Sequence, residues 1–233
     1  MKPHRRLPRA AAGVGRQPRG TNDQVSELTT NRLSVYLRCL TTLEAAGVKN
    51  VSSRALADQF YLNAAQIRKD LAYFGEFGTR GVGYQVSVLR AHLREILGLD
   101  RSIGVAILGA GNLGRALADY PGFRREGFSV VGLFDDDPAA IGQRSRAGVP
   151  IHDIRALKSM VRAEGIRIAV VAVPPASAQA VVDTVVGAGV KAILNFSPGA
   201  IAVPDDVKLK SVDLTVSLES LSFHLARGGD DDG

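Results

Sequence analysis

The residues with the most definite chemistry lie between Ile103 and Asp137. A short β-type run leads into Gly-Ala-Gly-Asn-Leu-Gly, and a second such run ends in three consecutive aspartates. This G-x-G-x-x-G pattern follows a predicted strand, opens a predicted helix and is followed by an acid at the end of the next strand, as in a βαβ dinucleotide-binding unit. The stretch therefore predicts a nicotinamide dinucleotide site, and a glycine turn without a ligand is the alternative.

Each residue of this motif has a predicted task. Gly109 permits the tight turn, Gly111 lets the backbone approach the pyrophosphate, and Gly114 lets the helix pack closely on the strand. Asp135 ends the second strand, where its carboxylate would accept hydrogen bonds from the ribose hydroxyls. The two aspartates that follow it oppose a 2′-phosphate, so NAD(H) is predicted in preference to NADP(H).

A second group of candidate residues precedes this unit. Residues 54–60 and 64–74 are predicted to form two short helices joined by a three-residue turn, which is the helix-turn-helix pattern. On the second helix, Gln66, Arg68 and Lys69 are left partly or wholly outward. Gln66 suits an adenine edge, while Arg68 and Lys69 suit guanine or phosphate. From this segment alone, a helical hairpin with a solvated polar face is an equal alternative.

The next stretch favours the DNA-binding interpretation. Residues 75–86 are punctuated by glycines and contain short β-type pieces, as a small hairpin requires. A hairpin that follows a helix-turn-helix is a wing. Arg80 lies at its glycine-flanked tip, from where an arginine can reach a phosphate or the minor groove.

The remaining patterns predict the elements that position these residues. Residues 29–46 are predicted as a first helix, and residues 88–97 as the helix that closes the first domain. From residue 100, β-type and helical patterns alternate with short connections, which predicts a mainly parallel, doubly wound sheet. The elements expected after the glycine motif are helix 113–119, stopped at Pro121-Gly122, strand 148–151, helix 154–163, strand 167–173, helix 176–188 and strand 190–196.

The last apolar pattern, residues 218–226, predicts an amphipathic helix after the sheet is complete. Such a helix needs another surface to cover. Packing on its own domain and packing across a dimer are equally compatible with the pattern.

Composition and charge exclude several classes of protein. The chain has 233 residues, of which 45% are hydrophobic and 22% charged, as in a soluble globular protein of one or two domains. With no apolar run long enough for a membrane span and no secretory signal, a cytoplasmic location is expected. Cys39 is the only cysteine, which excludes an intrachain disulfide and a zinc finger and favours a packing role. Residues 1–20 carry six Lys/Arg and no acid, which suggests attraction to a polyanion, although solubility or a translation-start artefact explains them almost as well.

The sequence lacks the parts that a dehydrogenase needs. Such an enzyme requires a proton donor or acceptor near the reacting carbon and a pocket for its second substrate. The predicted sheet ends near residue 210 with no separate substrate domain, and none of the five tyrosines has a lysine four residues later. His152 and His224 are possible bases, but a lone histidine is more often structural. The cofactor is therefore interpreted as a signal, with no catalytic residue and no metal site predicted.

From about residue 27 to 227, the chain resembles the Rex family of bacterial redox-sensing transcriptional repressors. The resemblance rests on motifs in both predicted domains, namely Tyr36-Leu37-Arg38, Gln66 to Leu71 with Tyr73-Phe74-Gly75, Gly78 to Tyr84, Gly109 to Gly114 with Ala118-Asp119-Tyr120, Ile193 to Phe196, and Val212-Asp213.

The resemblance implies a homodimer in which the C-terminal helix is swapped onto the partner, and which binds operator DNA at an inverted repeat. It also implies that NADH and NAD⁺ compete for one pocket, with NADH favouring release of DNA that controls respiratory and fermentative genes. Tyr120 would lie beside the nicotinamide, and Arg38 would form a redox-responsive ion pair with the partner subunit's Asp213. Leu214 replaces an aromatic residue of some members, and Asn112 replaces an arginine of others.

The chain is predicted to have two folded domains, each with its own binding site. The predicted domains are a basic disordered arm (1–26), a winged-helix DNA-binding domain (27–99), a Rossmann NAD(H)-binding domain (100–211), the swapped helix (212–227) and an acidic tail (228–233). The predicted cofactor-binding residues are Gly109, Ala110, Gly111, Asn112, Leu113, Gly114, Asp135, Tyr120, Val173 and Pro174. The predicted DNA-binding residues are Gln66, Arg68, Lys69, Tyr73 and Arg80, and the predicted redox switch is Arg38, Asp213 and Tyr120.

Two other functions remain open on the sequence. A small NAD-dependent oxidoreductase with an N-terminal helical extension would turn over a carbonyl compound and ignore DNA. A winged-helix regulator of another nucleotide ligand, such as a coenzyme A derivative, would share the first domain, and the acids at Asp135 disfavour it.

Overall fold

The structure is a computed structural model that describes residues 25–228. The chain divides into two compact units, with the division between Gly98 and Leu99. The predicted basic arm, except for its last two residues, and the predicted acidic tail, except for its first, lie outside the described residues. None of the helices in the described part of the chain is both long and apolar enough to cross a membrane.

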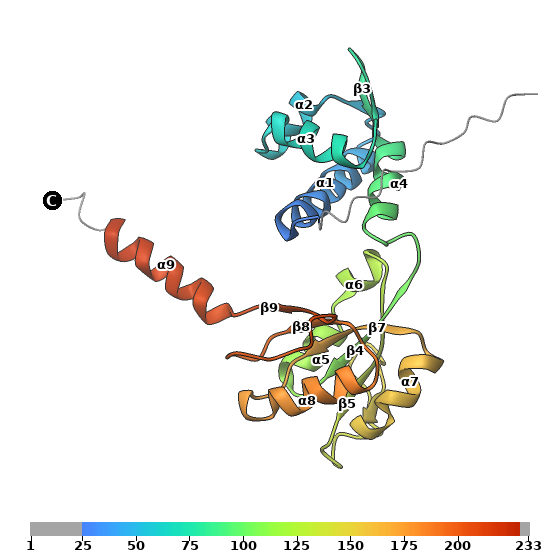
Figure 1. The fold of residues 1–233 in the computed structure, drawn as a ribbon, viewed down its shortest axis with the longest axis vertical. Helices are drawn as coiled ribbons and strands as arrows, with labels where there is room; N and C mark the ends of the chain where they lie inside the picture. Colours follow the sequence, from blue (N-terminus) through green and yellow to red (C-terminus); the bar gives the residue numbers. More distant parts are fainter. Residues whose placement is uncertain (1–24, 229–233) are drawn as a thin grey trace, which may run out of the picture. The chain divides into compact units, whose positions relative to one another are not determined.

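Over its described residues, 25–98, the first unit combines four helices with a small sheet (Figure 1). Its antiparallel strands lie in the order β1-β3-β2, so that β2 and β3 form the predicted wing hairpin. The elements are α1 (Glu27–Ala45), β1 (Asn50–Val51), α2 (Ser53–Phe60), α3 (Ala64–Phe74), β2 (Gly78–Thr79), β3 (Gly83–Gln85) and α4 (Val86–Ile96).

Short polar side chains fix where these helices begin. Ser26 caps α1, Ser52 caps α2, and Asn63 caps α3 by accepting hydrogen bonds from free backbone N–H groups of the first turn. Gly75, with a φ of +154°, ends α3 as predicted. The core between the helices consists of apolar side chains that are almost fully buried, namely Leu33, Leu37, Leu40, Leu43, Leu56, Ile67, Leu71, Leu89 and Leu93.

The second unit is built on a six-stranded parallel sheet in the order β6-β5-β4-β7-β8-β9. Numbered within the unit, this order is 3-2-1-4-5-6, which reverses direction between β4 and β7 and is typical of dinucleotide-binding folds. The elements are β4 (Ile103–Leu108), α5 (Asn112–Ala118), α6 (Pro121–Arg125), β5 (Phe128–Asp135), β6 (Ile151–Asp153), the 3-10 turn η1 (Ile154–Ala156), α7 (Leu157–Ala163), β7 (Ile166–Val171), α8 (Pro175–Gly187), β8 (Ala192–Asn195), β9 (Lys208–Ser211) and α9 (Leu214–Gly228).

Helices cover both faces of this sheet. Leu157 of α7 and Val182 of α8 pack in the core of one face, and Ala118 of α5 packs in the core of the other. Alternate residues along β4 contribute to the two cores: Ala106 faces α7 and α8, and Ile107 faces α5. The predicted fold class, a winged helix-turn-helix followed by a doubly wound sheet, is therefore confirmed.

Several predicted boundaries are wrong for identifiable reasons. Pro121 does not only stop the preceding helix: it takes the first position of the short helix α6, where its missing N–H costs nothing. The strand predicted from residue 148 begins at Ile151, because Pro150 forms an isolated bridge with Arg144 instead. Strand β9 was not predicted, since its Lys-Leu-Lys-Ser sequence belongs to an exposed sheet edge.

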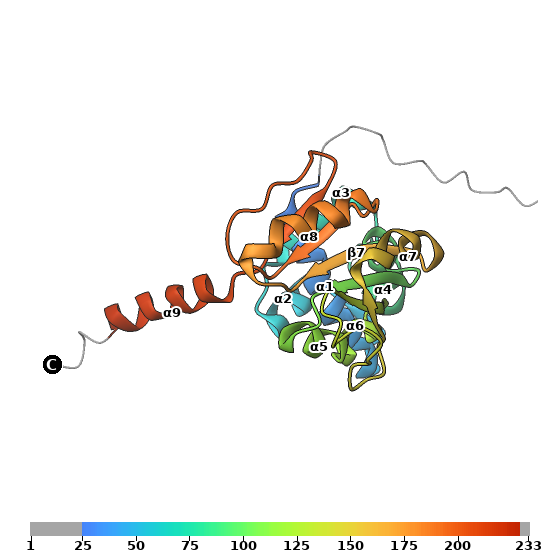
Figure 2. The ribbon, with the colours of Figure 1, turned by 90° about the horizontal axis from the view of Figure 1, so that it is seen from below.

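The C-terminal helix begins earlier than predicted and buries none of residues 214–226. Asp213 caps α9, because its Oδ1 accepts hydrogen bonds from the N–H groups of Thr215 (2.9 Å) and Val216 (3.3 Å). In Figures 1 and 2, α9 runs away from the sheet that precedes it. Its exposed apolar side chains are Leu214, Val216, Leu218, Leu221, Phe223 and Leu225. Within residues 25–226, no other part of the chain therefore covers this apolar face.

Candidate functional site

The three glycines of the loop between β4 and α5 have different surroundings. A Cβ on Gly109, whose φ is +101°, would lie 2.5 Å from the carbonyl oxygen of Ala172 on the adjacent strand connection. A Cβ on Gly114 would lie 1.9 Å from the carbonyl oxygen of Gly109, so α5 can approach the loop only with glycine there. A Cβ on Gly111 would meet no atom within 4 Å. Packing therefore requires the first and third glycines, whereas the second borders open space.

This loop borders a cavity of about 270 Å³ at the carboxyl ends of β4, β5 and β7. The position is the switch point of the sheet, where parallel α/β sheets bind their ligands. The predicted residues that line it are Gly109, Gly111, Asp135, Val173 and Pro174. The structure does not bring Ala110, Asn112, Leu113, Gly114 or Tyr120 to its lining.

Asp135 joins the end of β5 to the glycine loop. Its Oδ2 accepts a hydrogen bond from the N–H of Ala110 at 2.5 Å, and its Oδ1 accepts one from the N–H of Asp137 at 3.0 Å. Asp136 also lines the cavity. Carboxylates thus concentrate negative charge at the end of the cavity where a ribose is predicted, which fits hydroxyl donors and repels a phosphate.

Side chains outside the motif hold the cavity walls in place. Arg115 donates from Nε to the carbonyl oxygen of Ala110 at 2.7 Å, which fixes the glycine loop from the helix side. Asn195 is completely buried and accepts a hydrogen bond from the Ser197 N–H at 2.9 Å, and the Ser197 hydroxyl donates to the carbonyl oxygen of Val173. Asn195, the last residue of β8, and Ser197 therefore position a wall of the cavity.

Tyr120 lies at a second, separate hollow of the same unit. It is the residue before α6, its side chain is 57% exposed, and its ring meets that of Phe123 edge-on at 5.3 Å. With Phe123 and Phe128 it lines a hollow of about 220 Å³. The predicted contact between Tyr120 and a nicotinamide stays a prediction.

In the first unit, α3 and the wing hairpin enclose an open groove of about 530 Å³. Arg68 and Arg80 both line this groove, and Arg68 donates to the hydroxyl of Ser53 at 2.9 Å. Gln66, Lys69 and Tyr73 also lie on α3 but do not line the groove. Two of the five predicted DNA-binding residues thus line the same groove. Of the other three, Lys69 and Tyr73 are exposed on α3, whereas Gln66 is half-buried and donates to Asp70.

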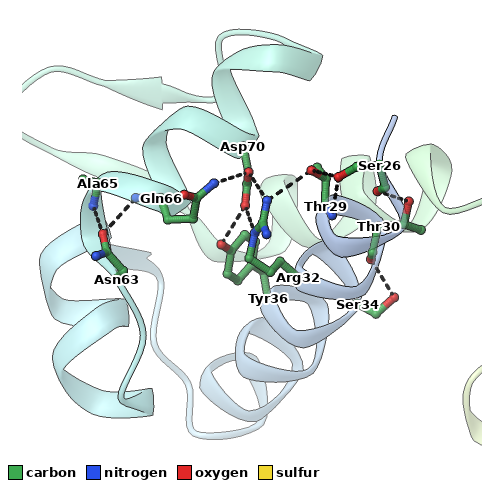
Figure 3. A network of polar contacts seen from close by, with 10 residues as sticks. All are labelled: Ser26, Thr29, Thr30, Arg32, Ser34, Tyr36, Asn63, Ala65, Gln66 and Asp70. Carbon is green, nitrogen blue, oxygen red and sulfur yellow. Dashed lines mark hydrogen bonds and ion pairs between the residues drawn. The ribbon is translucent and has the colours of Figure 1, made fainter. Parts of the chain in front are cut away.

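The polar contacts that fix α3 were missed by the sequence analysis. Asp70 is only 4% exposed and accepts hydrogen bonds from Arg32 and Tyr36 of α1 and from Gln66 of α3 (Figure 3). Arg32 lowers the pKa of the Asp70 carboxyl below its ordinary value by hydrogen bonding, and burial opposes this shift. An acid next to the apolar stripe of α3 was the available signal, since buried carboxylates need partners.

The remaining predicted switch residues belong to different units. Arg38 is exposed on α1, and Asp213 caps α9 in the second unit, so their ion pair stays a prediction. Cys39 is buried, and burial raises the pKa of its thiol, as expected of a packing residue. Across residues 25–228, no three His, Cys, Asp or Glu side chains are grouped so as to hold a metal ion.

Comparisons with known proteins match both units. Residues 24–72 match the family model described as "Putative DNA-binding protein N-terminus", and residues 100–199 match the model described as "CoA binding domain". A protein of Carboxydothermus hydrogenoformans named redox-sensing transcriptional repressor Rex is 48% identical over 204 residues, which are 88% of this chain and 98% of that protein. The chain belongs to the Rex family.

Solved Rex structures agree with this assignment. The structure of RSP, described as a Rex-family repressor, in complex with β-NAD⁺ and operator DNA has a TM-score of 0.83 at 41% identity, covering 88% of this Rex chain and 94% of RSP. The RSP complex with β-NADH has a TM-score of 0.77 at 39% identity, and the match covers 89% of this chain and 97% of RSP. The resemblance predicted from the motifs is thereby confirmed.

The glycine loop gives a prediction that separates ligand binding from folding. Gly111→Ala should leave the fold intact, because its Cβ enters open space, but should weaken NADH binding at least about tenfold by blocking the approach of a phosphate to the loop. Gly114→Ala should lower the free energy of unfolding by about 1–3 kcal/mol, because its Cβ meets backbone. Titration of NADH fluorescence and thermal unfolding measure the two effects. Unchanged NADH affinity in folded Gly111→Ala would contradict this assignment of the loop.

Proposed function

We propose that this Rex-family chain is a transcriptional repressor that senses the NADH/NAD⁺ ratio in the cytoplasm. It binds operator DNA when NADH is low and releases it when NADH binds, and we propose respiratory and fermentative genes as its targets. The observation that carries this function is the union, in one chain, of a winged helix and a glycine-loop cavity at the sheet switch point. The relatives are named as repressors, and the nucleotide is a signal here, not a substrate.

For the nucleotide, we propose that the loop around Gly111 binds the pyrophosphate and that Asp135 binds the adenosine ribose. The open space at Gly111 and the free amides at the start of α5 support the first contact. The carboxylate of Asp135 already accepts two backbone hydrogen bonds and lines the cavity, which supports the second. Asn112, Leu113 and Tyr120 are proposed to contact the nucleotide outside this cavity. NADH differs from NAD⁺ in charge at the nicotinamide, because the oxidised ring is cationic and the reduced ring is neutral.

For DNA, we propose that α3 enters the major groove and that the wing reaches an adjacent backbone or minor groove. Gln66 and Lys69 lie in the N-terminal half of α3, the part that meets base edges in helix-turn-helix proteins. Arg68 and Arg80 line the groove between α3 and the hairpin, where guanidinium groups suit phosphates. Tyr73, 56% exposed at the far end of α3, completes the proposed interface.

We propose that two chains form a dimer in which α9 of each packs on the other. Six large apolar side chains of α9 are exposed in the single chain, which is costly unless another surface covers them. A two-fold dimer also matches an operator with inverted half-sites. Exchange of α9 would carry the partner subunit's Asp213 toward Arg38 and Tyr120, the proposed redox switch.

The switch needs only a modest energy difference. A ligand shifts a two-state equilibrium by its difference in affinity for the two states, and about 5.5 kcal/mol moves a population from 1:99 to 99:1. A neutral and a cationic nicotinamide differ in the free energy of desolvation near a phenol and an ion pair. The protein can therefore bind NADH and NAD⁺ with different affinities.

Operator binding under nucleotide control tests this function. The expected result, by fluorescence anisotropy with DNA from the protein's own promoter, is binding that NADH abolishes and NAD⁺ restores. NADPH and coenzyme A, at the same concentrations, should have no effect, because the acids at Asp135 and Asp136 oppose an extra phosphate. DNA binding that ignores all of these nucleotides, or release by coenzyme A alone, would contradict the proposal.

A matched pair of variants tests the dimer and the switch separately. Asp213→Asn keeps an N-cap for α9 but removes the charge, so the dimer should be preserved. The factor by which NADH lowers the affinity for DNA should fall at least about tenfold. Leu221→Asp places a charge on the apolar face of α9 and should yield monomers. Sedimentation velocity measures the dimer, and the anisotropy assay measures the NADH effect on DNA binding. A monomeric native chain would refute the proposed dimer. A normal NADH response in Asp213→Asn would refute the role of Asp213 in the switch.

A further inference from the structure

The polar cluster of Arg32, Tyr36, Gln66 and Asp70 holds the amide of Gln66, a half-buried side chain of the helix proposed to meet DNA. Asp70 Oδ2 accepts from Arg32 Nε at 2.6 Å and from the Tyr36 hydroxyl at 2.9 Å. Asp70 Oδ1 accepts from Arg32 Nη2 at 2.8 Å and from Gln66 Nε2 at 2.7 Å. Figure 3 shows these contacts, of which those of Arg32 and Tyr36 join α1 to α3 and that of Gln66 lies within α3. Each carboxylate oxygen thus accepts two hydrogen bonds, which is its full capacity.

The carboxylate of Asp70 remains an acceptor because it is ionised. Hydrogen bonding to Arg32 lowers its pKa although burial opposes the charge. An ionised carboxylate has no hydrogen to donate. A buried charge of this kind is tolerated only because the guanidinium faces it with two donors.

This acceptor determines which end of the Gln66 amide points inward. If the amide were turned over, Oε1 would face Asp70 Oδ1, and two acceptors would meet at hydrogen-bond distance. The amide nitrogen must therefore face Asp70. The backbone at the same position is also held, because Asn63 Oδ1 accepts from the Gln66 N–H at 3.0 Å.

The remaining amide groups match one base. Among the described residues Gln66 makes no other side-chain hydrogen bond, which leaves one N–H donor and the Oε1 acceptor for an external ligand. Glutamine reads adenine by pairing one donor with N7 and its acceptor with the N6 amino group. A side chain whose orientation is already set loses less conformational freedom on binding.

We propose that Asp70 is a positioning residue for base recognition: it holds the Gln66 amide in the orientation that reads an adenine in each operator half-site. This inference rests on the proposed function, since it assumes that α3 enters the major groove. Asp70 also joins α1 to α3, so its test must separate base preference from stability.

Selection from a randomised duplex DNA library by the full-length chain supplies that test. The native chain should enrich an inverted repeat with an adenine that Gln66→Ala no longer prefers. Asp70→Asn lets either end of the Gln66 amide face inward and should reduce the preference for the same adenine by about tenfold. Tyr36→Phe removes another hydrogen bond to the same carboxylate without touching Gln66, so it should keep the preference whatever its effect on stability.

A second variant covers the case in which Asp70→Asn does not fold. Asp70→Asn combined with Arg32→Gln removes both charges of the ion pair together and leaves no unpaired guanidinium. It should show the same loss of adenine preference. Native preference in either folded variant, or in Gln66→Ala, would overturn the inference while leaving the repressor function standing. If the native chain enriches no inverted repeat, the proposed function itself fails, and the inference fails with it.

Discussion

The second unit depends on one close contact, the approach of α5 to the loop that precedes it. The carbonyl oxygen of Gly109 occupies the place where any larger residue at position 114 would put its Cβ. This contact brings the first amides of α5 to the carboxyl ends of the strands. Asp135 of the neighbouring strand then reaches the loop, where its carboxylate accepts the hydrogen bond of the Ala110 N–H. Backbone packing thus positions the residues of the proposed pyrophosphate and ribose sites.

The first unit is held by a different interaction, an ion pair between the buried carboxylate of Asp70 and the partly exposed guanidinium of Arg32. Arg32 and Asp70 join α1 to α3, and Tyr36 adds a third hydrogen bond to the same carboxylate. Buried ion pairs often contribute little net stability, and their best attested use is to define one arrangement among several. Here the arrangement defined is that of α3 relative to α1. The helix proposed to meet DNA is therefore connected by polar contacts to the helix that carries Arg38.

Local patterns predicted much of this architecture because the relevant forces are local. Helix α3 begins after Asn63 and ends before Gly75, because these two residues cap it. The spacing of the glycines in the motif was enough to predict the loop between β4 and α5. The cluster at Asp70 was not predicted, because its partners on α1, Tyr36 and Arg32, are 34 and 38 residues away in the chain. Strand β9 and the separate hollow of Tyr120 were missed for the same reason: edge pairing and cavity lining depend on residues brought together by the fold.

The central claim is that nucleotide binding and operator binding are linked, and linkage requires that the effect be reciprocal. The most direct measurement is the affinity of the full-length chain for NADH, by calorimetry, with and without saturating operator DNA. The account predicts that operator DNA weakens NADH binding by the same factor by which NADH weakens operator binding. Equal NADH affinity in the two titrations would contradict it, even if both ligands bind.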